Sequence, residues 1–346
     1  AKFPRNAIAF KWADEVAKTK LLEMEWSASR TGLINPVAIF EPVELEGTTV
    51  SRASVHNISI VRELKLGIGD EIEVYKANMI IPQIAKNLTE SDSLEIPDKC
   101  PVCGEKTVIH KENDVEVLFC ENPDCLAKKI KSISLFVSRD AMNIDGMSEA
   151  TIEKFIARGF LHELADLFKL ERYKDEIISM EGFGEKSYEK LIKAADAAKV
   201  TTTAKFIYSL GISGIGLSNA KMICKAFDND FDKIRKVSRE ELIEIDGVGE
   251  VLADSFVRFF EKENNNHVVD DLLKIIKMED SESSVQNDME GMNFVITGSV
   301  NHFSNRGAVK ELVESRGGKV TGSVTSKTKY LINNDSTSNS SKNKKA

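Results

Sequence analysis

Four of the five cysteines in this chain of 346 residues lie close together. The segment "CPVCG" supplies Cys100 and Cys103, and "CENPDC" supplies Cys120 and Cys125. Two short thiol turns separated by the length of a β-hairpin can converge on the corners of a tetrahedron, which is the geometry of a structural Zn²⁺ site. Four sulfur ligands leave no open position for water, so we expect a metal that stabilises the fold and performs no catalysis.

Disulfide bonds are the alternative for the same four cysteines. No segment of the sequence resembles a secretory signal, and a reducing compartment favours metal-binding thiolates over disulfides. The fifth cysteine, Cys224, lies in "AKMICKAF" at helical spacing, which predicts a buried core thiol. We therefore expect zinc at the four clustered cysteines.

The composition is that of a globular protein with several domains. Hydrophobic residues make up 42% and charged residues 29% of the chain, and no apolar run approaches the length of a membrane span. The length predicts two to four domains. The net charge of -8 argues against a protein that binds polyanions by bulk charge, so local geometry would have to provide any phosphate binding.

A glycine motif recurs four times between probable helices. The repeats are "NIDGMSEATIEKF", "SMEGFGEKSYEKL", "GISGIGLSNAKMI" and "EIDGVGEVLADSF", and their first glycines are 36, 32 and 33 residues apart, at Gly146, Gly182, Gly214 and Gly247. A second glycine follows two positions later in three repeats, at Gly184, Gly216 and Gly249, whereas the first repeat has Ser148. A fixed spacing of this kind indicates an internal repeat.

The two glycines predict different roles. The first can end a helix with positive φ, as in any αα-hairpin. The second keeps the backbone bare at the start of the next helix, where free N–H groups and the helix dipole favour an anion. The pattern resembles the helix-hairpin-helix family, which binds duplex DNA through its backbone without reading sequence. An α-solenoid is the alternative, although such repeats do not need paired glycines.

Charges near the glycines rank the four repeats. Lys186 adds a cation in the second repeat, whereas Glu185 and Glu250 oppose an anion. We expect the second and third repeats to be the better phosphate binders and the fourth to be largely structural.

Residues 20 to 90 have short apolar runs broken by Gly and Pro, which predict about five strands and a small Greek-key barrel such as an OB-fold. Barrels of this kind present binding residues on loops. The candidates for DNA binding are polar residues next to turns, namely Arg30, Thr31, Ser54, His56 and Asn57.

The last part of the chain predicts a strand, a helix and two further strands. The first strand, "MNFVITGSV", ends in Thr297 and Gly298. This order resembles the first part of a BRCT domain, in which such a turn and a later lysine, here Lys327, can hold a phosphate. A purely structural turn is the alternative.

The succession of segments resembles bacterial NAD-dependent DNA ligase. It comprises "AIAFKWADE", "SRTGLINPVAIFEPVELEGTTVSRASVHN", "GIGDEIEVYKANMIIPQ", the four cysteines and the glycine repeats. The resemblance implies that Lys11 contacts the adenylate. The family's nucleophilic lysine lies in a Lys-x-Asp-Gly motif that this sequence lacks. We therefore expect a fragment that supplies DNA binding and that should not adenylylate itself.

The expected fold class is multidomain α+β. The expected parts are the end of a nucleotidyltransferase domain (1–18), an OB-fold barrel (19–95), a four-cysteine zinc finger (96–130), an all-α helix-hairpin-helix domain (131–278), a linker (279–291) and a truncated α/β BRCT module (292–346).

The resemblance implies a ligase that seals 5′-phosphate, 3′-hydroxyl nicks during DNA replication and repair through lysyl-adenylate and DNA-adenylate intermediates. It implies NAD, Zn²⁺ and Mg²⁺ or Mn²⁺ as cofactors, and nicked duplex DNA and AMP as partners. It also implies a cytoplasmic, nucleoid-associated bacterial protein, which we expect to be a monomer without membrane contact. A non-catalytic DNA-binding scaffold and a nuclease with the same repeats are the alternatives.

Overall fold

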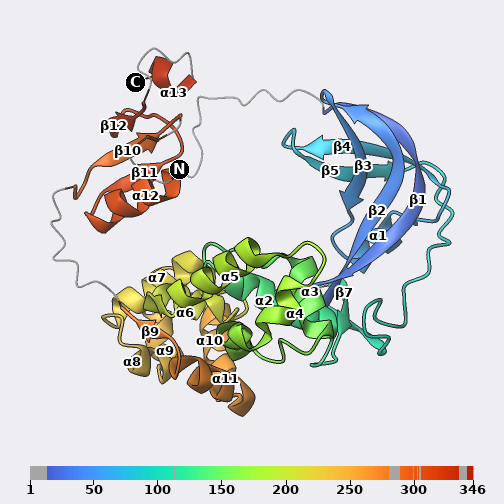
Figure 1. Ribbon diagram of the computed structural model, residues 1–346. Helices are drawn as coiled ribbons and strands as arrows, with labels where there is room; N and C mark the ends of the chain where they lie inside the picture. The colour runs from blue at the N-terminus through green and yellow to red at the C-terminus, as the bar shows by residue number, and fades with distance from the viewer. Residues whose placement is uncertain are drawn as a thin grey trace. The chain divides into compact units, whose positions relative to one another are not determined.

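The structure is a computed structural model, and it describes residues 14–112, 114–279, 289–298, 300, 301, 303, 305–334 and 341–345. The chain divides into two compact units, Ala1–Met278 and Glu279–Ala346, each with its own core. Figure 1 shows a sheet followed by a helical region in the first unit and a small α/β fold in the second. None of the described helices combines the length and the hydrophobicity that crossing a bilayer requires.

The first unit begins with a strongly bent antiparallel sheet. Its strands are β1 (Val16–Ala28), β2 (Leu33–Leu45), β3 (Thr48–Ser54), β4 (Glu71–Ala77) and β5 (Ile81–Asn87), and helix α1 (Ile58–Glu63) joins β3 to β4. Buried and partly buried residues alternate along the first half of β2, as expected for a strand with one face on a core. β1 pairs with both β2 and β4, and β3 approaches β5, so the sheet curls into the predicted OB-fold barrel.

The cysteine-containing segment extends this sheet. Strands β6 (Thr107–Glu112) and β7 (Val115–Cys120) form a hairpin, and β7 pairs with the start of β2. The resulting strand order is β5-β4-β1-β2-β7-β6. The barrel and the cysteine segment therefore share one hydrogen-bonded sheet.

The rest of the first unit is helical, as the repeats predict. The elements are α2 (Leu126–Val137), α3 (Glu149–Ala157), the 3₁₀ helix η1 (Leu164–Tyr173), α4 (Lys174–Ile178), α5 (Glu185–Ala197), α6 (Thr203–Ser209), α7 (Leu217–Ala226), α8 (Phe231–Arg235), α9 (Arg239–Ile243), α10 (Glu250–Glu261) and α11 (Glu263–Leu273). The two-residue strands β8 (Val200–Thr201) and β9 (Lys277–Met278) pair in parallel. One continuous core fills this region, with Phe136, Phe155, Phe206 and Phe256 fully buried.

Each glycine repeat is a turn between two helices. We name the turns hairpin 1 (residues 146–148, before α3), hairpin 2 (182–184, between α4 and α5), hairpin 3 (214–216, between α6 and α7) and hairpin 4 (247–249, between α9 and α10). The residue in the middle of each turn is apolar and faces the core. Met147, Ile215 and Val248 are buried, and Phe183 is partly buried.

The second unit has the predicted strand-helix-strand-strand order. Its elements are β10 (Asn293–Ile296), α12 (Arg306–Ser315), β11 (Lys319–Thr321), β12 (Thr328–Ile332) and the short α13 (Ser341–Lys345). β10 lies between β11 and β12 in a parallel sheet. Phe294, Ile296, Val309 and Val313 form its core.

A buried carboxylate stabilises one end of the barrel. Asp70 is 2% exposed and accepts hydrogen bonds from the Gly67 amide at 2.8 Å and from Asn87 Nδ2 at 2.7 Å. Asn87 also donates to the carbonyls of Leu64 and Lys65. Burial raises the pKa of Asp70, but hydrogen bonds from Ser91, Asn87 and Gly67 outweigh it, so the pKa lies below its usual value.

This network predicts a pH-dependent contribution to stability. Because the pKa of Asp70 is lower in the folded state, its contribution is present above the unfolded value of about 3.9 and is lost as the pH falls through the folded value. We expect Asp70→Asn to reduce the free energy of unfolding by about 1–3 kcal/mol at pH 6. The loss should shrink near pH 3.

Urea denaturation followed by tryptophan fluorescence measures both values. Glu71→Gln is the matched control, because Glu71 is the adjacent carboxylate and is exposed. An equal loss for Asp70→Asn at both pH values would show that the charge of Asp70 is not what stabilises this end of the barrel.

Candidate metal centre and nucleic-acid interface

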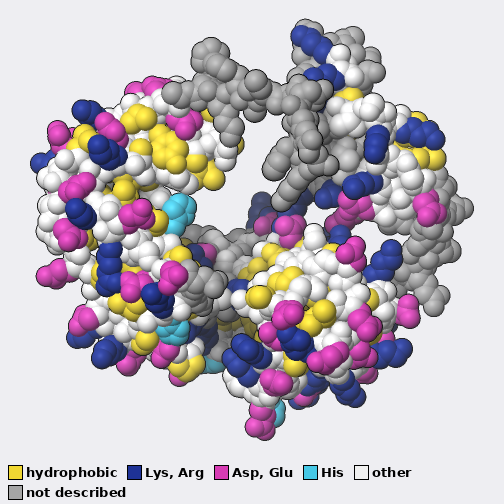
Figure 2. Space-filling view, turned by 180° about the vertical axis from the view of Figure 1, so that it is seen from behind, with side chains coloured by type: hydrophobic (Ala, Val, Ile, Leu, Met, Phe, Trp, Pro, Cys, Tyr) yellow, Lys and Arg dark blue, Asp and Glu magenta, His cyan; other side chains and the backbone are white. Residues whose placement is uncertain are grey.

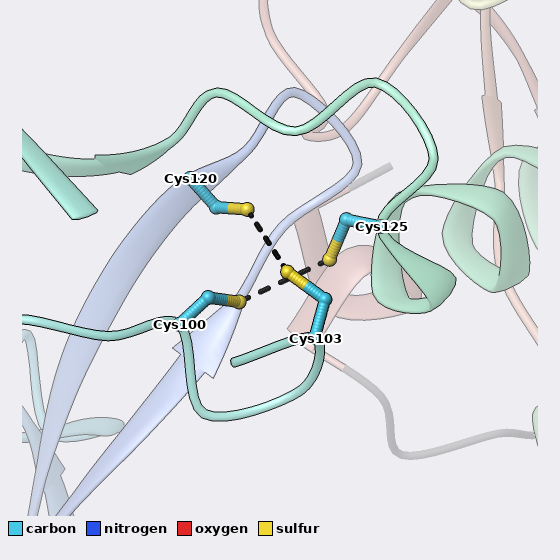
Figure 3. Close-up of side chains that lie close together, drawn as sticks. All are labelled: Cys100, Cys103, Cys120 and Cys125. Carbon is cyan, nitrogen blue, oxygen red and sulfur yellow. Dashed lines mark hydrogen bonds between the residues drawn. The ribbon is translucent and has the colours of Figure 1, made fainter. Parts of the chain in front are cut away.

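The four predicted cysteines form one cluster. Their sulfur atoms all lie within 4.8 Å of one another. The Sγ atoms of Cys100 and Cys125 are 3.9 Å apart, and those of Cys103 and Cys120 are 3.5 Å apart. Figure 3 shows the four side chains pointing toward a common centre. Sulfurs bound at about 2.3 Å to one tetrahedral ion are about 3.8 Å apart, so the cluster has the dimensions of a Cys₄ zinc site.

The described cysteines form no disulfide in this structure. A disulfide bond is about 2.05 Å long, and the sulfur atoms of the cluster are farther apart than that. Cys224 is buried in the helical core, 1% exposed, as its spacing predicts. The convergence of all four sulfurs on one centre favours the metal site over the disulfide alternative.

Three kinds of local structure position the sulfurs. Cys100 and Cys103 lie in a turn closed by a hydrogen bond from the Gly104 amide to the Cys100 carbonyl at 3.0 Å, and Gly104 has a φ of +73°. Cys120 is the last residue of β7, and Cys125 is the N-cap of α2. The two cysteines of each short segment are held close by a local turn, and the β6–β7 hairpin brings the two segments together.

The thiols differ in acidity. Burial raises the pKa of Cys120 to about 12. Burial also disfavours the Cys103 thiolate, but hydrogen bonds from the Glu105 amide, the Asn122 side chain and Cys120 outweigh it and lower the pKa of Cys103 to about 7. Four thiolates this close repel one another, and a bound divalent cation removes that repulsion. The donor set therefore suits a soft, tetrahedral cation such as Zn²⁺.

The first glycine of every hairpin has a left-handed backbone. The φ angles are +93° at Gly146, +84° at Gly182, +76° at Gly214 and +90° at Gly247. A side chain at these positions is strained, and in two cases it would also collide with a neighbouring helix. A Cβ on Gly214 would lie 2.7 Å from Leu252 Cδ2, and a Cβ on Gly247 would lie 2.7 Å from Met222 Cε.

The second glycine is a bare helix N-cap. Gly184, Gly216 and Gly249 are the N-caps of α5, α7 and α10, and all three have extended backbones. A Cβ at any of them would meet no atom within 4 Å. In hairpin 1, by contrast, the Ser148 hydroxyl accepts a hydrogen bond from the Thr151 amide and so occupies the helix end itself. In hairpin 2 the Ser187 hydroxyl accepts a hydrogen bond from the Gly184 amide at 2.8 Å, so that one amide already has a protein partner. Hairpins 2, 3 and 4 nevertheless have no side chain at the N-cap position itself, which leaves space for an anion in front of the helix N-terminus.

The hairpins associate in pairs through reciprocal contacts. Lys154, on the helix after hairpin 1, donates to the carbonyl of Glu181 at 3.5 Å. Lys190, on the helix after hairpin 2, forms an ion pair with Asp145 at 2.5 Å. Hairpins 3 and 4 are crossed in the same way. Met222, on the helix after hairpin 3, lies against Gly247, and Leu252, on the helix after hairpin 4, lies against Gly214. Each pair therefore presents two helix N-termini in a fixed relation.

The charges differ around the fourth hairpin. Arg239 forms ion pairs with Glu250 at 3.1 Å and with Asp254 at 2.6 Å, both on α10. Glu250 is the first residue of that helix, so a carboxylate already lies at its N-terminus. Hairpin 2 has a carboxylate at the corresponding position, Glu185, but the next residue of α5 is the exposed cation Lys186. This arrangement agrees with the expectation that hairpin 4 is a weaker anion site, which remains a prediction.

The five loop residues of the barrel lie in two places. Arg30 and Thr31 are in the turn between β1 and β2, and Arg30 Nη1 donates to the carbonyl of Gly211 in the helical region. Ser54 ends β3, and its Oγ accepts from the amide of His56, which is exposed. Asn57 caps α1 by accepting from the Ile60 amide at 3.0 Å. The structure thus gives Arg30 and Asn57 protein partners that sequence reasoning missed.

An exposed apolar tip was also missed. Met79 and Ile80, between β4 and β5, and Ile81, the first residue of β5, are 70%, 76% and 51% exposed. Asn78 and Met79 both have positive φ, so the tip is a tight turn. The signal was present in the sequence, since three consecutive large apolar residues in a barrel turn have no core to enter. The surface around the barrel and helices otherwise mixes Lys and Arg with Asp and Glu, as Figure 2 shows for one face.

The structure does not bring together the two parts of the phosphate site that was expected in the second unit, Lys327 and the Thr297–Gly298 turn. Lys327 precedes β12, and its carbonyl accepts from Asn293 at the start of β10. Thr297 and Gly298 follow the opposite end of β10, about 13 Å away along a strand of that length. Parallel pairing of β10 and β12 causes this separation. Lys342 lies nearer the turn, because its Nζ donates to the Ile296 carbonyl at 3.3 Å.

Two further expectations fall on undescribed positions. Lys11 and most of the acidic linker, residues 280–288, lie outside the described residues.

Family models match four consecutive parts of the chain. The NAD-dependent DNA ligase OB-fold domain matches residues 18–95, and the SAM-like helix-hairpin-helix tandem matches residues 138–197. The helix-hairpin-helix motif matches residues 205–269, and the BRCA1 C terminus (BRCT) domain matches residues 284–346. The first three matched regions carry the barrel and all four glycine hairpins.

Curated relatives match the whole chain. DNA ligases of Lachnoclostridium phytofermentans and Ruminiclostridium cellulolyticum are 61% and 60% identical over 100% of this chain and 53% of their own length. The DNA ligase of Oceanobacillus iheyensis is 37% identical over 96% of this chain and 50% of its own length. The chain spans about half the length of the curated relatives it matches. In its sequence and in the order of its barrel, cysteine cluster, hairpins and BRCT module, it corresponds to the carboxy-terminal portion of NAD-dependent DNA ligase.

Proposed function

We propose that this chain holds nicked duplex DNA for a NAD-dependent ligase. The observation that carries the proposal is the open space in front of α5 and α7, where the N-cap glycine has no Cβ to keep a DNA phosphate away from the first main-chain amides of the helix. Contacts of this kind position a duplex without reading its sequence. The site at α5 belongs to the pair of hairpins 1 and 2, and the site at α7 belongs to the pair of hairpins 3 and 4, so each pair would contribute one open helix N-terminus to the duplex.

The barrel contributes a second type of contact. The exposed tip formed by Met79, Ile80 and Ile81 resembles the apolar wedges that proteins insert between base steps in the minor groove. A duplex is easier to distort at a nick, because one strand is interrupted. The tip and the hairpins together would hold and bend the DNA around the break.

Ligation itself would require parts beyond the residues described. In the first proposed step a lysine attacks the adenylyl phosphorus of NAD and releases nicotinamide mononucleotide. The adenylate then passes from the lysine to the DNA 5′-phosphate, and attack of the 3′-hydroxyl on that phosphate forms the phosphodiester bond and displaces AMP. Mg²⁺ would neutralise phosphate charge in these steps. Lys11 is proposed to contact the adenylate, where a fixed cation would stabilise developing charge.

Zinc at the four cysteines has a structural role in this proposal. Cys120 ends a strand of the barrel sheet, and Cys125 begins a helix of the helical core, so a bound ion would join the two regions. The site would have no coordination position for substrate.

Metal content tests the zinc assignment. We expect about one zinc per chain, and Cys103→Ser should lower both the zinc content and the melting temperature, since structural zinc stabilises folds by about 10–16 kcal/mol. Elemental analysis and differential scanning calorimetry measure the two quantities. Cys224→Ser, outside the cluster, is the control for loss of a thiol and should retain its zinc. Purified wild-type protein without zinc would contradict the assignment.

Alanine at the N-cap glycines tests the phosphate sites. Gly184→Ala and Gly216→Ala should each weaken binding to a nicked duplex roughly tenfold, because a methyl group blocks approach to the amides and a charge-assisted hydrogen bond is lost. Neither methyl meets a protein atom within 4 Å, so the fold should be retained. Fluorescence anisotropy with a labelled nicked duplex measures the affinity.

Two controls accompany these variants. Gly322→Ala places a methyl in equally open space in the second unit and should leave affinity unchanged. Gly249→Ala should have a smaller effect than Gly216→Ala, since Glu250 opposes an anion at the start of α10 whereas the first turn of α7 has no acidic residue. Wild-type affinity in both Gly184→Ala and Gly216→Ala would remove the hairpins from the binding site.

Salt dependence tests whether phosphates dominate binding. We expect affinity for nicked duplex to fall by roughly tenfold or more between 50 mM and 200 mM salt, because each neutralised phosphate releases counterions. Duplexes of unrelated sequence should bind alike. Equal affinity at the two salt concentrations would be inconsistent with binding through the DNA backbone.

A further inference from the structure

The third residue of the helix after each hairpin has a different role in each repeat. These residues are Thr151, Ser187, Asn219 and Leu252 in hairpins 1 to 4. The N–H groups at the start of a helix have no partner within it, and a side chain at this position can reach back to them or to the turn. The residue type therefore decides which backbone groups of the turn are left for a ligand.

In hairpins 1, 2 and 4 an amide at the start of the helix already has a protein partner. The Thr151 amide donates to the hydroxyl of the N-cap serine at 3.2 Å, and the Gly184 amide donates to the Ser187 hydroxyl at 2.8 Å. In hairpin 4 the Leu252 amide donates to the Gly249 carbonyl at 3.0 Å. Each of these turns thus has an amide that is already engaged when an anion approaches.

Asn219 acts as a donor in hairpin 3 instead. Its Nδ2 donates to the Gly214 carbonyl at 3.1 Å. A carbonyl oxygen can only accept, so the nitrogen of the carboxamide faces it. Among the residues that the structure describes, none accepts a hydrogen bond from the amides of residues 216–219. Hairpin 3 therefore combines an engaged carbonyl with a run of open amides.

The peptide group between Gly214 and Ile215 is held at both ends. Its carbonyl accepts from Asn219, and its N–H donates to the Ile212 carbonyl at 3.1 Å. Gly214 has a φ of +76°, and a Cβ there would lie 2.7 Å from Leu252 Cδ2, so the α10 side of the turn is closely packed as well. The Asn219 bond is thus the part of this arrangement that fixes the direction of the carbonyl.

The other hairpins with paired glycines lack this bond. The N–H groups of Phe183 and Val248 each donate to the carbonyl three residues earlier, as that of Ile215 does. In the described part of the chain, however, nothing donates to the carbonyl of Gly182 or of Gly247. The peptide group of the turn is therefore fixed at one end in hairpins 2 and 4 and at both ends in hairpin 3.

We propose that Asn219 is a positioning residue for phosphate binding by hairpin 3. Its hydrogen bond fixes the peptide group after Gly214, so the amides of residues 216–219 keep one orientation and the carbonyl oxygen, which would repel a phosphate, stays engaged. Ordering the turn in advance reduces the entropy that binding would otherwise cost. This inference rests on the proposed DNA binding for its consequence, but the order of the turn can be measured without DNA.

Asn219→Ala removes the donor and leaves every charge in place. We expect it to weaken binding to a nicked duplex by roughly three- to tenfold, the range that corresponds to one net hydrogen bond. Combined with Gly216→Ala in the same hairpin, it should cause no loss beyond that of Gly216→Ala alone, whereas its effect should add to that of Gly184→Ala in hairpin 2. Wild-type affinity in Asn219→Ala, or a loss that adds fully to that of Gly216→Ala, would overturn the proposal.

Asn265→Ala is the matched control. Asn265 is the third residue of α11, as Asn219 is of α7, and its Nδ2 donates to the Phe259 carbonyl at 2.8 Å. It follows no glycine hairpin, so Asn265→Ala should lose at least as much stability in urea denaturation and bind nicked duplex like the wild type. A loss of affinity equal to that of Asn219→Ala would contradict the proposal, because loss of such a bond anywhere in the helical region would then be sufficient.

Backbone dynamics of the full chain without DNA separate positioning from direct contact. Selective nitrogen-15 labelling of glycine and isoleucine gives the order parameters of the Ile215 and Gly216 N–H groups. We expect about 0.85, typical of a rigid backbone, in the wild type and in Asn265→Ala, and values falling toward about 0.6 in Asn219→Ala. Unchanged order parameters together with weaker DNA binding would overturn the proposal, because Asn219 would then contact the DNA itself. If the wild type fails to bind nicked duplex, the proposed function falls, while the order parameters still decide whether Asn219 holds the turn.

Discussion

The junction at the four cysteines constrains the whole first unit. Cys120 is the final residue of a strand that belongs to the barrel sheet, and Cys125 caps a helix whose far end is buried among helical core residues. Trp26 packs against both the barrel core and the smaller core around the cysteines. The barrel core and the small core around the sulfur atoms therefore share a residue, and α2 leads from the sulfur atoms into the helical core. Anything that fixes those sulfurs also fixes the direction in which α2 leaves the sheet.

The glycines of the hairpins show how one residue type meets two different physical demands. The first glycine of each turn supplies a left-handed backbone, and in hairpins 3 and 4 it also allows a neighbouring helix to approach. The second has an extended backbone that any residue could adopt, and a Cβ added there would meet no atom within 4 Å. Packing does not require glycine there, so the bare surface points to a ligand that must come close to the main chain.

Several features could be predicted from the residues alone because they depend on local chemistry. The spacing of the cysteines indicated two turns joined by a hairpin, and the sulfurs do converge. The helical spacing around Cys224 indicated a buried thiol, and Cys224 is indeed buried. The strand-helix-strand-strand order of the last module was also confirmed.

Other features could not be predicted because they depend on contacts between distant segments. Arg30 and Gly211 are 181 residues apart, and nothing in either local sequence indicates the other. Asn57 next to a turn gave no sign that its side chain caps a helix. Lys327 was matched to the Thr297–Gly298 turn by order along the chain, but parallel strand pairing places it at the other end of β10.

By itself, the sequence determined the modules, their order, the metal-ligand set and the bare helix ends, since each follows from the type and spacing of neighbouring residues. Only the tertiary structure decided how those modules are joined: the cysteine hairpin continues the barrel sheet, the hairpins cross in pairs, and Arg30 reaches the third of them. The physical reason is that backbone conformation and ligand geometry are short-range, whereas packing between sheet and helices depends on which surfaces meet once the chain has folded.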